Sequence, residues 1–543
     1  MKPGNELLFC ALGGSGEIGM NVNLYGSQGK WLMVDLGMSF SGAEYPGVDL
    51  VFADLEFIEE RCDDLLGIVL THAHEDHIGA VPYFAEALGV PLYATPFTAK
   101  LVAAKLDEAG LTGDVELIVV DDLETFTLGP FGIRYVPLAH SIAEGNALLI
   151  ETPHGRIFHT GDWKLDEDPQ IGTPTTAEEL TEIGDAGVLG LVCDSTNVFN
   201  PEPSGSEGAV FEGLLDEVRK HTGKRVLVTT FASNVARLQT LGEVARATNR
   251  TLCVAGRSLD RIIEAAQASG YLENFPETVD FDTAMDLPRG GLLVVATGGQ
   301  GEPRAALARI ADDSHPIKLD EGDVVLFSSR QIPGNEIAIG KIQNQLADRG
   351  IRVVTDRQSM IHVSGHPGRP ELEALYGWLR PEILVPVHGE IRHMREQAAL
   401  GLASGIPQAV FQKNGDLVRL APGLPGKIAE VRAGRLVLDG TEIVPANGES
   451  IVQRRRIAYN GLVSVAFDLS GVVDIRVSGL PLEDDAEEFV EEAAADVAEA
   501  VARKRHEGRE AILEAARLAA RRAAVRWTGK RPQVHVLCLE DLD

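Results

Sequence analysis

Short apolar runs alternate with amphipathic stretches along the first two hundred residues of the chain. Continuous apolar runs over 31–36 and 67–71 predict buried strands, and each run is followed by a polar, loop-like segment. Residues 81–88 and 98–109 place apolar side chains at helical spacing, and the run 90–94 between them predicts a further strand. Strands that alternate with helices in this way indicate an α/β fold.

The same alternation starts again, with new elements, between about residues 204 and 349. Strands are predicted over 224–230, 292–296 and 323–327, and a helix over 234–247. This spacing predicts a second compact α/β domain that resembles nucleotide-binding domains.

A third region follows the Pro/Gly-rich stretch 421–426, which predicts a linker. Beyond it we expect a hairpin over 435–444, a strand over 462–469 and a long helical zone over 486–524. The helical zone is acidic first and basic later. Its basic part is either the solvated face of a surface helix or a face that contacts RNA or another subunit. The arginines of this part are Arg517, Arg521, Arg522 and Arg526.

Composition narrows the class of protein. The 543 residues include 49 Lys+Arg and 81 Asp+Glu, which gives a formal net charge of −32. A hydrophobic content of 44% is ordinary for a globular protein, and the length suggests roughly three or four domains. No apolar run of about 18 residues occurs, so a membrane-spanning helix is not expected. Because an acidic surface repels phosphates at long range, composition alone favours a soluble enzyme with a small-molecule substrate or a metal-rich site.

The cysteines and the N-terminus favour a cytoplasmic protein. The five cysteines are far apart, form no C-x-x-C motif and are odd in number, which indicates reduced thiols rather than a disulfide framework. Residues 1–11 contain one Lys and a short apolar stretch, too little for a secretory signal. We therefore expect a cytoplasmic location and no membrane partner.

The segment 71–77, Thr-His-Ala-His-Glu-Asp-His, concentrates potential metal ligands directly after an apolar run. Imidazole and carboxylate groups suit Zn²⁺ and similar divalent ions. His72 and His74 alternate, so they can share one ion, whereas Asp76 and His77 begin the next helix and can reach a second. A surface histidine cluster is the alternative, but further candidate ligands follow other predicted strands, and these are His140, Asp162 and His388.

Taken in order, H-x-H-x-D-H, a single His, an Asp and a late His resemble the metallo-β-lactamase superfamily. Asp194, in Asp-Ser-Thr-Asn, and residues 362–366, His-Val-Ser-Gly-His, are similar to motifs of its β-CASP branch, which cuts nucleic acids. More specifically, five segments resemble the bacterial ribonuclease J family, and they cover residues 11–19, 231–234, 297–303, 332–336 and 387–390. The similarity is dense in the first four hundred residues and looser over the last hundred.

This resemblance implies a site for two divalent ions, Zn²⁺ first, with Mn²⁺ or Mg²⁺ as alternatives. Two such ions roughly 3.5–4 Å apart activate water for attack on phosphorus. Asp35 resembles the residue that orients the ligand histidines from behind. Asp76 is expected to be both a ligand and a catalytic residue. The two ligand sets, joined by a bridging Asp162, are His72, His74 and His140, and Asp76, His77 and His388.

The resemblance also implies how the substrate is bound and cleaved. His366 would protonate the leaving 3′ oxygen, and Asp194 would orient it and keep it protonated. A pocket for a 5′ monophosphate would be built from the loop 362–366 and a Ser-rich turn. Arg330, which follows that turn, is either a phosphate contact or a surface charge. The expected substrate-binding residues are His362, Val363, Ser364, Gly365, His366, Ser328 and Ser329, with Phe231, Ser233 and Asn234 at a strand-to-helix junction.

Several of these assignments have simpler alternatives. Asn234 could act only as a helix N-cap. The Gly-rich turns at 13–16 and 298–301 do not match the phosphate-loop pattern, so we expect tight turns rather than NTP binding. RNA binding by so acidic a chain needs a short positive track, for which the sequence offers Arg237, Arg257, Arg304 and Arg330.

The resulting hypothesis for the fold is a metallo-β-lactamase αββα sandwich with an inserted β-CASP α/β domain and a small C-terminal α/β domain. The expected boundaries are 1–203 and 350–423 for the sandwich, 204–349 for the insertion, 424–448 for a linker and 449–543 for the C-terminal domain. The resemblance also implies a homodimer or homotetramer that forms through the C-terminal domain.

The function implied is a metal-dependent ribonuclease that degrades single-stranded, 5′-monophosphorylated RNA in the 5′→3′ direction, with some endonuclease activity, in RNA maturation and decay. Three alternatives stay open at this point. A small-molecule hydrolase would not need Asp194 and His366. A DNA nuclease is harder to exclude because nothing visibly senses a 2′-OH. A non-catalytic partner subunit of a ribonuclease complex would not need the complete ligand set.

Overall fold

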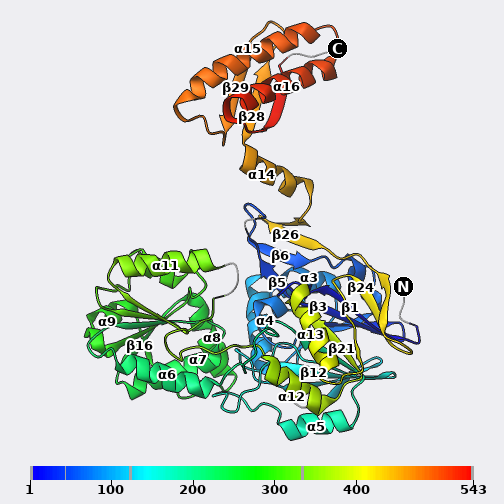
Figure 1. Cartoon of the computed structure of the whole chain (residues 1–543), viewed down its shortest axis with the longest axis vertical. Coiled ribbons are helices and arrows are strands. Elements are labelled where there is room, and N and C mark those ends of the chain that lie inside the picture. The colour runs from blue at the N-terminus through cyan, green and yellow to red at the C-terminus, as the bar shows by residue number, and fades with distance from the viewer. Residues whose placement is uncertain (1–3, 43, 122–124, 332–334, 540–543) are drawn as a thin grey trace. The chain divides into compact units, whose positions relative to one another are not determined.

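The computed structural model describes residues 4–42, 44–121, 125–331 and 335–539. Residues 332–334, in one of the family-like segments, lie outside the described residues. The chain divides into two compact units (Figure 1). The first comprises Met1–Ser39 and Phe52–Gly434, and the second comprises Phe40–Val51 and Arg435–Asp543.

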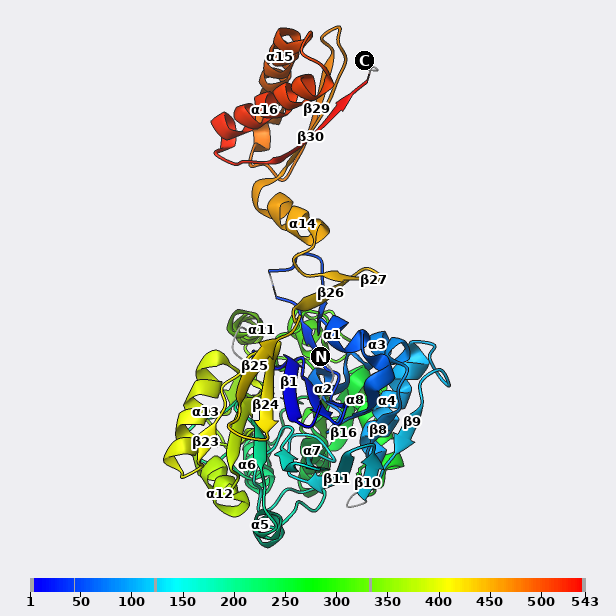
Figure 2. The same ribbon diagram turned by 90° about the vertical axis from the view of Figure 1, so that its right-hand side faces the viewer.

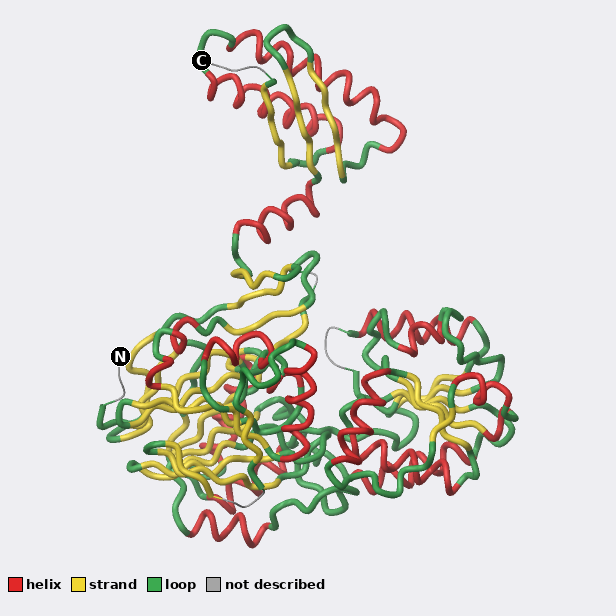
Figure 3. Tube along the Cα trace, turned by 180° about the vertical axis from the view of Figure 1, so that it is seen from behind, coloured by secondary structure: helices red, strands yellow, loops and turns green. Residues whose placement is uncertain are grey.

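Two sheets pack face to face in the first unit (Figure 3). Their apolar inner sides share one core, to which Phe9 and Tyr25 contribute from the first sheet and Tyr135 and Ile150 from the second. In order, the first sheet contains β25 (Gly426–Glu430), β24 (Asp416–Ala421), β1 (Leu7–Gly13), β3 (Val22–Ser27), β4 (Lys30–Val34), β7 (Leu65–Val69), β8 (Leu92–Ala94) and β9 (Leu117–Val119). The second contains β10 (Thr125–Leu128), β11 (Phe131–Pro137), β12 (Asn146–Thr152), β13 (Gly155–His159), β14 (Gly190–Asp194), β21 (Ile383–Val387) and β23 (Gln408–Ala409).

Helices cover the outer sides of both sheets. On the first sheet, α4 (Pro96–Glu108) packs against β8 and β9, next to α3 (Val81–Leu88). On the second, an apolar core buries Leu180 of α5 (Ala177–Asp185), Leu375 of α12 (Arg369–Leu379) and Leu400 of α13 (Ile391–Ala403). The predicted αββα sandwich is therefore confirmed, and the ends of its predicted strands and helices differ from the sequence prediction by at most two residues.

The inserted domain leaves the second sheet between two of its neighbouring strands. β14 and β21 are parallel partners, with Gly190 opposite Ile383, yet almost two hundred residues separate them in sequence. The intervening chain forms a parallel six-stranded sheet in the order β17 (Thr278–Val279), β16 (Thr251–Ala255), β18 (Leu292–Ala296), β15 (Val226–Thr229), β19 (Val324–Phe327) and β20 (Arg352–Thr355). Its helices are α6 (Glu207–Arg219), α7 (Val235–Ala247), α8 (Arg257–Ala268), α9 (Phe281–Asp286), α10 (Ala306–Ala311) and α11 (Glu336–Asp348).

The second unit is a small α/β domain. In its sheet, β28 (Leu462–Phe467) pairs with β29 (Val473–Ser478) and β30 (Gln533–Cys538). The predicted helical zone forms two helices, α15 (Ala486–Lys504) and α16 (Arg509–Thr528), which lie on the same side of this sheet (Figure 2). The same unit contains α14 (Glu449–Asn460) and a hairpin of β26 (Arg435–Asp439) and β27 (Glu442–Pro445).

The predicted linker over 424–448 is wrong, because this stretch is built from strands. The Pro/Gly residues at 421–426 form the turn between β24 and β25, which pair antiparallel in the first sheet. Gly423 in that turn has a φ of +82°, a conformation that glycine adopts without strain. Turn chemistry and linker chemistry use the same residues, so composition alone did not separate the two.

A buried ion pair holds the inserted domain together beside the sandwich. Arg237 of α7 is fully buried, and its Nη2 lies 3.0 Å from Oε2 of Glu207, the first residue of α6. Its Nη1 donates to the carbonyl oxygens of Ser328, at 3.0 Å, and Ile361, at 3.2 Å. The expectation that Arg237 belongs to an exposed positive track is therefore wrong, because the guanidinium is enclosed and neutralised by a carboxylate.

The same pair is tied to the loop that follows β13. The backbone N–H of Glu207 donates to Oδ2 of Asp166 at 3.0 Å, and this carboxylate lies 2.7 Å from the buried Nζ of Lys164. Lys164 comes two residues after Asp162, one of the predicted metal ligands. A displacement of α6 would therefore be transmitted directly to the loop that carries Asp162.

Replacing Arg237 by Ala should lower the free energy of unfolding by about 3–5 kcal/mol, because it leaves the Glu207 carboxylate buried without its partner. The measurement is urea unfolding of the full chain. The control is Arg261→Ala, which removes an exposed pair with Glu108 and should cost about 1 kcal/mol or less. Equal losses for the two variants would contradict the assignment.

Candidate metal centre

The predicted ligands lie just beyond the ends of strands. His72 and His74 follow β7, His140 follows β11, and Asp162 follows β13. His388 directly follows β21. Because β13, β14 and β21 are parallel neighbours, their carboxyl ends meet at one edge of the second sheet. Ligands that are far apart in the sequence are brought together in this way.

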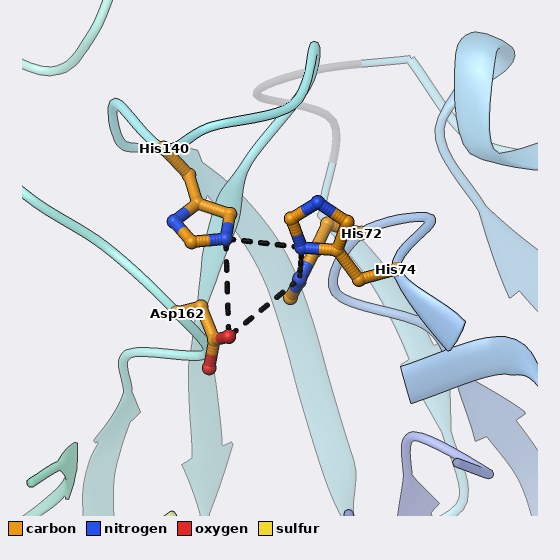
Figure 4. A group of neighbouring side chains, drawn as sticks. All are labelled: His72, His74, His140 and Asp162. Carbon is orange, nitrogen blue, oxygen red and sulfur yellow. Dashed lines mark hydrogen bonds and ion pairs between the residues drawn. The ribbon is translucent and has the colours of Figure 1, made fainter. Parts of the chain in front are cut away.

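Three imidazoles and one carboxylate form the first group (Figure 4). Nδ1 of His74 lies 3.1 Å from Nε2 of His72 and 3.1 Å from Nε2 of His140. Oδ2 of Asp162 lies 3.9 Å from His72 Nε2 and 3.8 Å from His140 Nε2. Burial lowers the pKa of His72 and His140 well below the usual value and that of His74 to about 4, so these rings are neutral.

Asp162 also belongs to a second group, with Asp76, His77 and His388. Its Oδ2 lies 3.3 Å from His77 Nε2 and its Oδ1 lies 3.3 Å from His388 Nδ1, while His388 Nε2 lies 3.1 Å from Asp76 Oδ2. Burial disfavours charge on His77 and His388, but the surrounding carboxylates, Asp162 first, outweigh it and raise both pKa values well above the usual one.

Contacts behind the ligands fix which ring nitrogen faces the site. The carboxylate of Asp35, which follows β4 with a φ of +64°, lies 2.7 Å from His77 Nδ1. His140 Nδ1 donates to the carbonyl oxygen of Gly365 at 2.6 Å. Both rings therefore keep a proton on Nδ1 and turn Nε2 toward the ligand groups, where a bound cation would displace any proton on that atom.

The geometry of both groups suits divalent cations. Around a tetrahedral ion with Zn–N distances of about 2.0–2.1 Å, ligand nitrogens lie about 3.3 Å apart. The two 3.1 Å separations, from His74 to His72 and to His140, are close to this value. A bound cation would stabilise these neighbouring nitrogens, whose lone pairs otherwise repel one another. Oδ1 of Asp162 is buried and has no hydrogen-bond partner among the described residues, which a cation would supply.

His366 and Asp194 complete the site. His366 Nδ1 lies 2.7 Å from Oδ2 of the fully buried Asp194, and the ring of His366 packs against those of His140 and His388. Burial alone would lower the pKa of His366, but the charge of Asp194 and its hydrogen bond raise it above the usual value. The structure brings the two residues together, and this contact leaves Nε2 of His366 as the atom that can exchange a proton.

Family models match most of the chain. The metallo-beta-lactamase superfamily matches residues 16–179, and the beta-CASP domain of ribonuclease J matches 223–346. The Zn-dependent metallo-hydrolase RNA specificity domain matches 350–410, and the ribonuclease J C-terminal domain matches 450–541. Ribonuclease J of Sinorhizobium meliloti is 41% identical over 99% of this chain and 98% of its own length. The chain belongs to the ribonuclease J family.

Other similarities agree with this family. Ribonuclease J of Mycolicibacterium smegmatis is 39% identical over 86% of this chain and 83% of its own length. A solved structure, a protein of unknown function from Enterococcus faecalis, has a TM-score of 0.56 and 17% identity. It covers 76% of this chain and all of its own, and it supports the fold alone. In the described part of this ribonuclease J family member, no helix is long and apolar enough to cross a bilayer.

The loop 362–366 of this family member contains a buried imidazole. Nδ1 of His362 is buried without a hydrogen-bond partner among the described residues. Burial lowers the pKa of His362 well below its usual value, and the positive charges of Arg237 and Arg330 lower it further. Ser364 Oγ accepts a hydrogen bond from the N–H of His366 at 3.1 Å.

Gly365 and Val363 shape the same loop by close packing. A Cβ on Gly365 would lie 2.9 Å from Ser141 Oγ and 3.1 Å from His140 Cε1, so a larger residue would crowd the predicted ligand His140. Val363 is buried against Gly205, where a Cβ would lie 2.6 Å from its Cγ1.

The other predicted substrate-binding residues divide between the site and the framework. Ser233 Oγ lies 3.1 Å from His74 Nε2. Phe231, two residues earlier in the chain, is half-buried. Asn234 Oδ1 accepts the N–H of Arg237 at 2.9 Å, so this side chain caps α7.

The two serines of the predicted phosphate turn are both buried in the framework. Ser328 Oγ donates to the carbonyl oxygen of Ile361 at 2.5 Å and accepts from Arg237, and Ser329 Oγ lies 3.4 Å from the carbonyl oxygen of Gly299. Arg330, by contrast, is exposed.

Sequence reasoning missed several contacts that hold the ligands. Asn21 Nδ2 lies 3.1 Å from His77 Nε2, Thr71 Oγ1 bonds Asp35, and Thr196 Oγ1 lies 2.8 Å from His388 Nδ1. The Gly-rich turn at 13–16 supports the site as well, because the carbonyl oxygen of Gly14 accepts the N–H of His388 at 2.7 Å. The adjacency of Thr71 and Thr196 to predicted functional residues was a usable signal, whereas nothing local marks Asn21.

Replacing Asp35 by Asn should weaken divalent-metal binding about 10–100-fold, because the ring of His77 loses the carboxylate that orients it. Competition with a coloured chelator measures the affinity. Asp323→Asn is the control, since it changes an equally buried carboxylate in the inserted domain. The control should retain the affinity for metal, and an Asp35→Asn chain that does the same would disprove the orienting role.

Proposed function

We propose that this chain is a metal-dependent ribonuclease that hydrolyses phosphodiester bonds at the centre described above. One observation carries the proposal: Asp162 belongs to three groups at once, two of them with the predicted ligands and the third with Asp194, His366 and His388. A two-cation site and a proton donor would thus share one carboxylate, an arrangement that suits hydrolysis of a phosphodiester. Membership of the ribonuclease J family and the RNA specificity domain support RNA as the substrate.

The chain's own side chains would divide the chemistry as follows. Two divalent ions, Zn²⁺ first, would supply an activated water and stabilise the charge that develops on phosphorus. His72, His74 and His140 would hold one ion, Asp76, His77 and His388 the other, with Asp162 between them. His366, held through Nδ1 by Asp194, would give the proton on Nε2 to the leaving 3′ oxygen. Ser233, next to His74, would contact the substrate's phosphate.

We propose that the enzyme degrades RNA from a 5′ monophosphate in the 5′→3′ direction and also cuts internally. The buried imidazole of His362, with a free Nδ1 near Arg237 and Arg330, supports an anion pocket at the loop 362–366. Backbone N–H groups of Val363, Ser364 and Gly365 would add donors. Ser328 and Ser329 would act by shaping the turn, because their hydroxyl groups are bound within the protein.

Location, cellular role and oligomeric state form the last part of the proposal. The five cysteines are free, which supports a cytoplasmic location. Similarity to ribonuclease J and to the RNA specificity domain supports a role in RNA maturation and decay. Leu537 in the edge strand β30 and Leu539 just after it are exposed. An apolar sheet edge can pair with another chain, which supports a homodimer or homotetramer formed through the C-terminal domain. The division of the chain at residues 203/204 is part of the same proposal. The expected boundary at 349/350 is wrong, because β20 (Arg352–Thr355) pairs with β19 in the sheet of the inserted domain.

Replacing His366 by Ala should reduce kcat about 10²–10⁴-fold, because the leaving oxygen loses its proton donor. Metal analysis of the purified variant should give the same content as the unmodified chain, since the two ligand sets are intact. His221→Ala is the control, because His221 bonds Glu217 within the inserted domain. Full activity of the His366→Ala chain would contradict the assigned role.

The substrate end is tested with one RNA sequence that carries a 5′ hydroxyl, a 5′ monophosphate or a 5′ triphosphate, and with the matching DNA. We expect mononucleotides to be released fastest from the monophosphorylated RNA, with internal fragments from all three RNAs. The sizes of labelled products over time give the result. Equal degradation of the three RNAs would remove the 5′ pocket from the proposal, and faster cleavage of DNA would replace the ribonuclease by a DNA nuclease.

A further inference from the structure

The C-terminal domain contains a concentration of positive charge in an otherwise acidic chain. Residues 509–531 include seven basic and two acidic side chains, a net charge of +5, whereas the rest of the chain carries −37. The charge is concentrated on α16 and the turn after it. Electrostatic forces are screened over about 8 Å at physiological salt, so a ligand at this surface senses the local charge rather than the total.

The basic side chains gather around a hollow of about 560 Å³. Four of its lining residues recur at the spacing of one helical face, and they are Leu518, Arg521, Arg522 and Val525. Arg526 and Arg531 complete the lining; Arg531 follows Gly529, whose φ of +70° ends the helix. The opposite face of α16 is buried through its alanines, so the basic face is the one left toward solvent.

Three of the four guanidinium groups have no carboxylate partner within the domain. Arg526 pairs with Glu492 and Asp496 of α15. For Arg521, Arg522 and Arg531, no carboxylate of the described residues lies within ion-pair distance, and Arg522 Nε donates only to the carbonyl oxygen of Leu518, at 3.2 Å. Neighbouring like charges of this kind repel one another, and a polyanion would relieve that repulsion.

We propose that this hollow binds the phosphate backbone of single-stranded RNA outside the metal centre. Guanidinium groups match phosphate oxygens in pairs, and the exposed Leu518 and Val525 offer apolar contact to sugars or bases between the phosphates. A second copy of the chain fits less well, because a symmetric contact at this face would bring identical arginines together. The choice of RNA as the polyanion rests on the proposed function.

The experiment uses the full chain with Arg521→Gln, Arg522→Gln and Arg531→Gln combined. The matched control removes three exposed charges elsewhere in the domain, with Arg476→Gln, Arg503→Gln and Arg505→Gln. Fluorescence anisotropy with labelled RNAs of about 6 and about 40 nucleotides, in chelator, measures binding without cleavage. Cleavage of the short RNA in the presence of metal tests the metal centre separately, and sedimentation gives the oligomeric state.

We expect the first variant to bind the long RNA roughly ten-fold more weakly, with a slope of log affinity on log salt reduced by about 2. Binding and cleavage of the short RNA should be unchanged, and the control should match the unmodified chain. Equal binding by the variant and its control would overturn the inference. A changed oligomeric state with unchanged RNA binding would also overturn it and assign the face to a second copy. Failure of the unmodified chain to cleave the short RNA would instead contradict the proposed function.

Discussion

The site depends on one buried carboxylate, Asp162, which faces the imidazoles of both ligand groups. A buried charge is costly unless it is compensated. Burial keeps His72 and His140 neutral, so within the protein only His77 and His388, whose pKa values Asp162 raises, can compensate it. One Asp162 oxygen has no hydrogen-bond partner in the described structure. Divalent cations resolve both problems together, because they take the carboxylate and the neutral ring nitrogens as ligands. The parallel strands β13, β14 and β21 end at the same edge of the sheet, and this places the residues that follow them close together.

The order of elements and the ligands of this site could be predicted from the sequence, because both depend on local patterns. Apolar runs marked the strands, and the polar residues after them, such as His140 and His388, are the predicted ligands that the structure brings together. The prediction of a linker was wrong because hairpin turns and linkers are rich in the same residue types, here Pro422 and Gly423. The contacts of Asn21 and Gly365 could not be predicted, since each joins segments far apart in the chain.

Arg237 shows how a long-range contact changes the role of a residue. Near the start of a helix in an acidic protein, an arginine has the local pattern of a surface cation available to a polyanion. The structure instead encloses it with Glu207 and two backbone carbonyl groups. Its charge stabilises the junction between α6, α7 and the chain that leads into the loop 362–366. A cluster of arginines that pair with no described carboxylate lies elsewhere, on α16 of the C-terminal domain and just after it. An overall charge of −32 is thus compatible with two separate places for RNA, one cationic through bound metal and one through arginines.

Diffraction from crystals of the zinc-loaded protein, measured at the zinc absorption edge, tests the two-cation site most directly. The predicted result is two anomalous peaks in each chain, roughly 3.5–4 Å apart, on either side of the Asp162 carboxylate. One should lie among His72, His74 and His140, and the other among Asp76, His77 and His388. Peaks away from these side chains, or a single peak that involves only one of the two sets at saturating zinc, would contradict it.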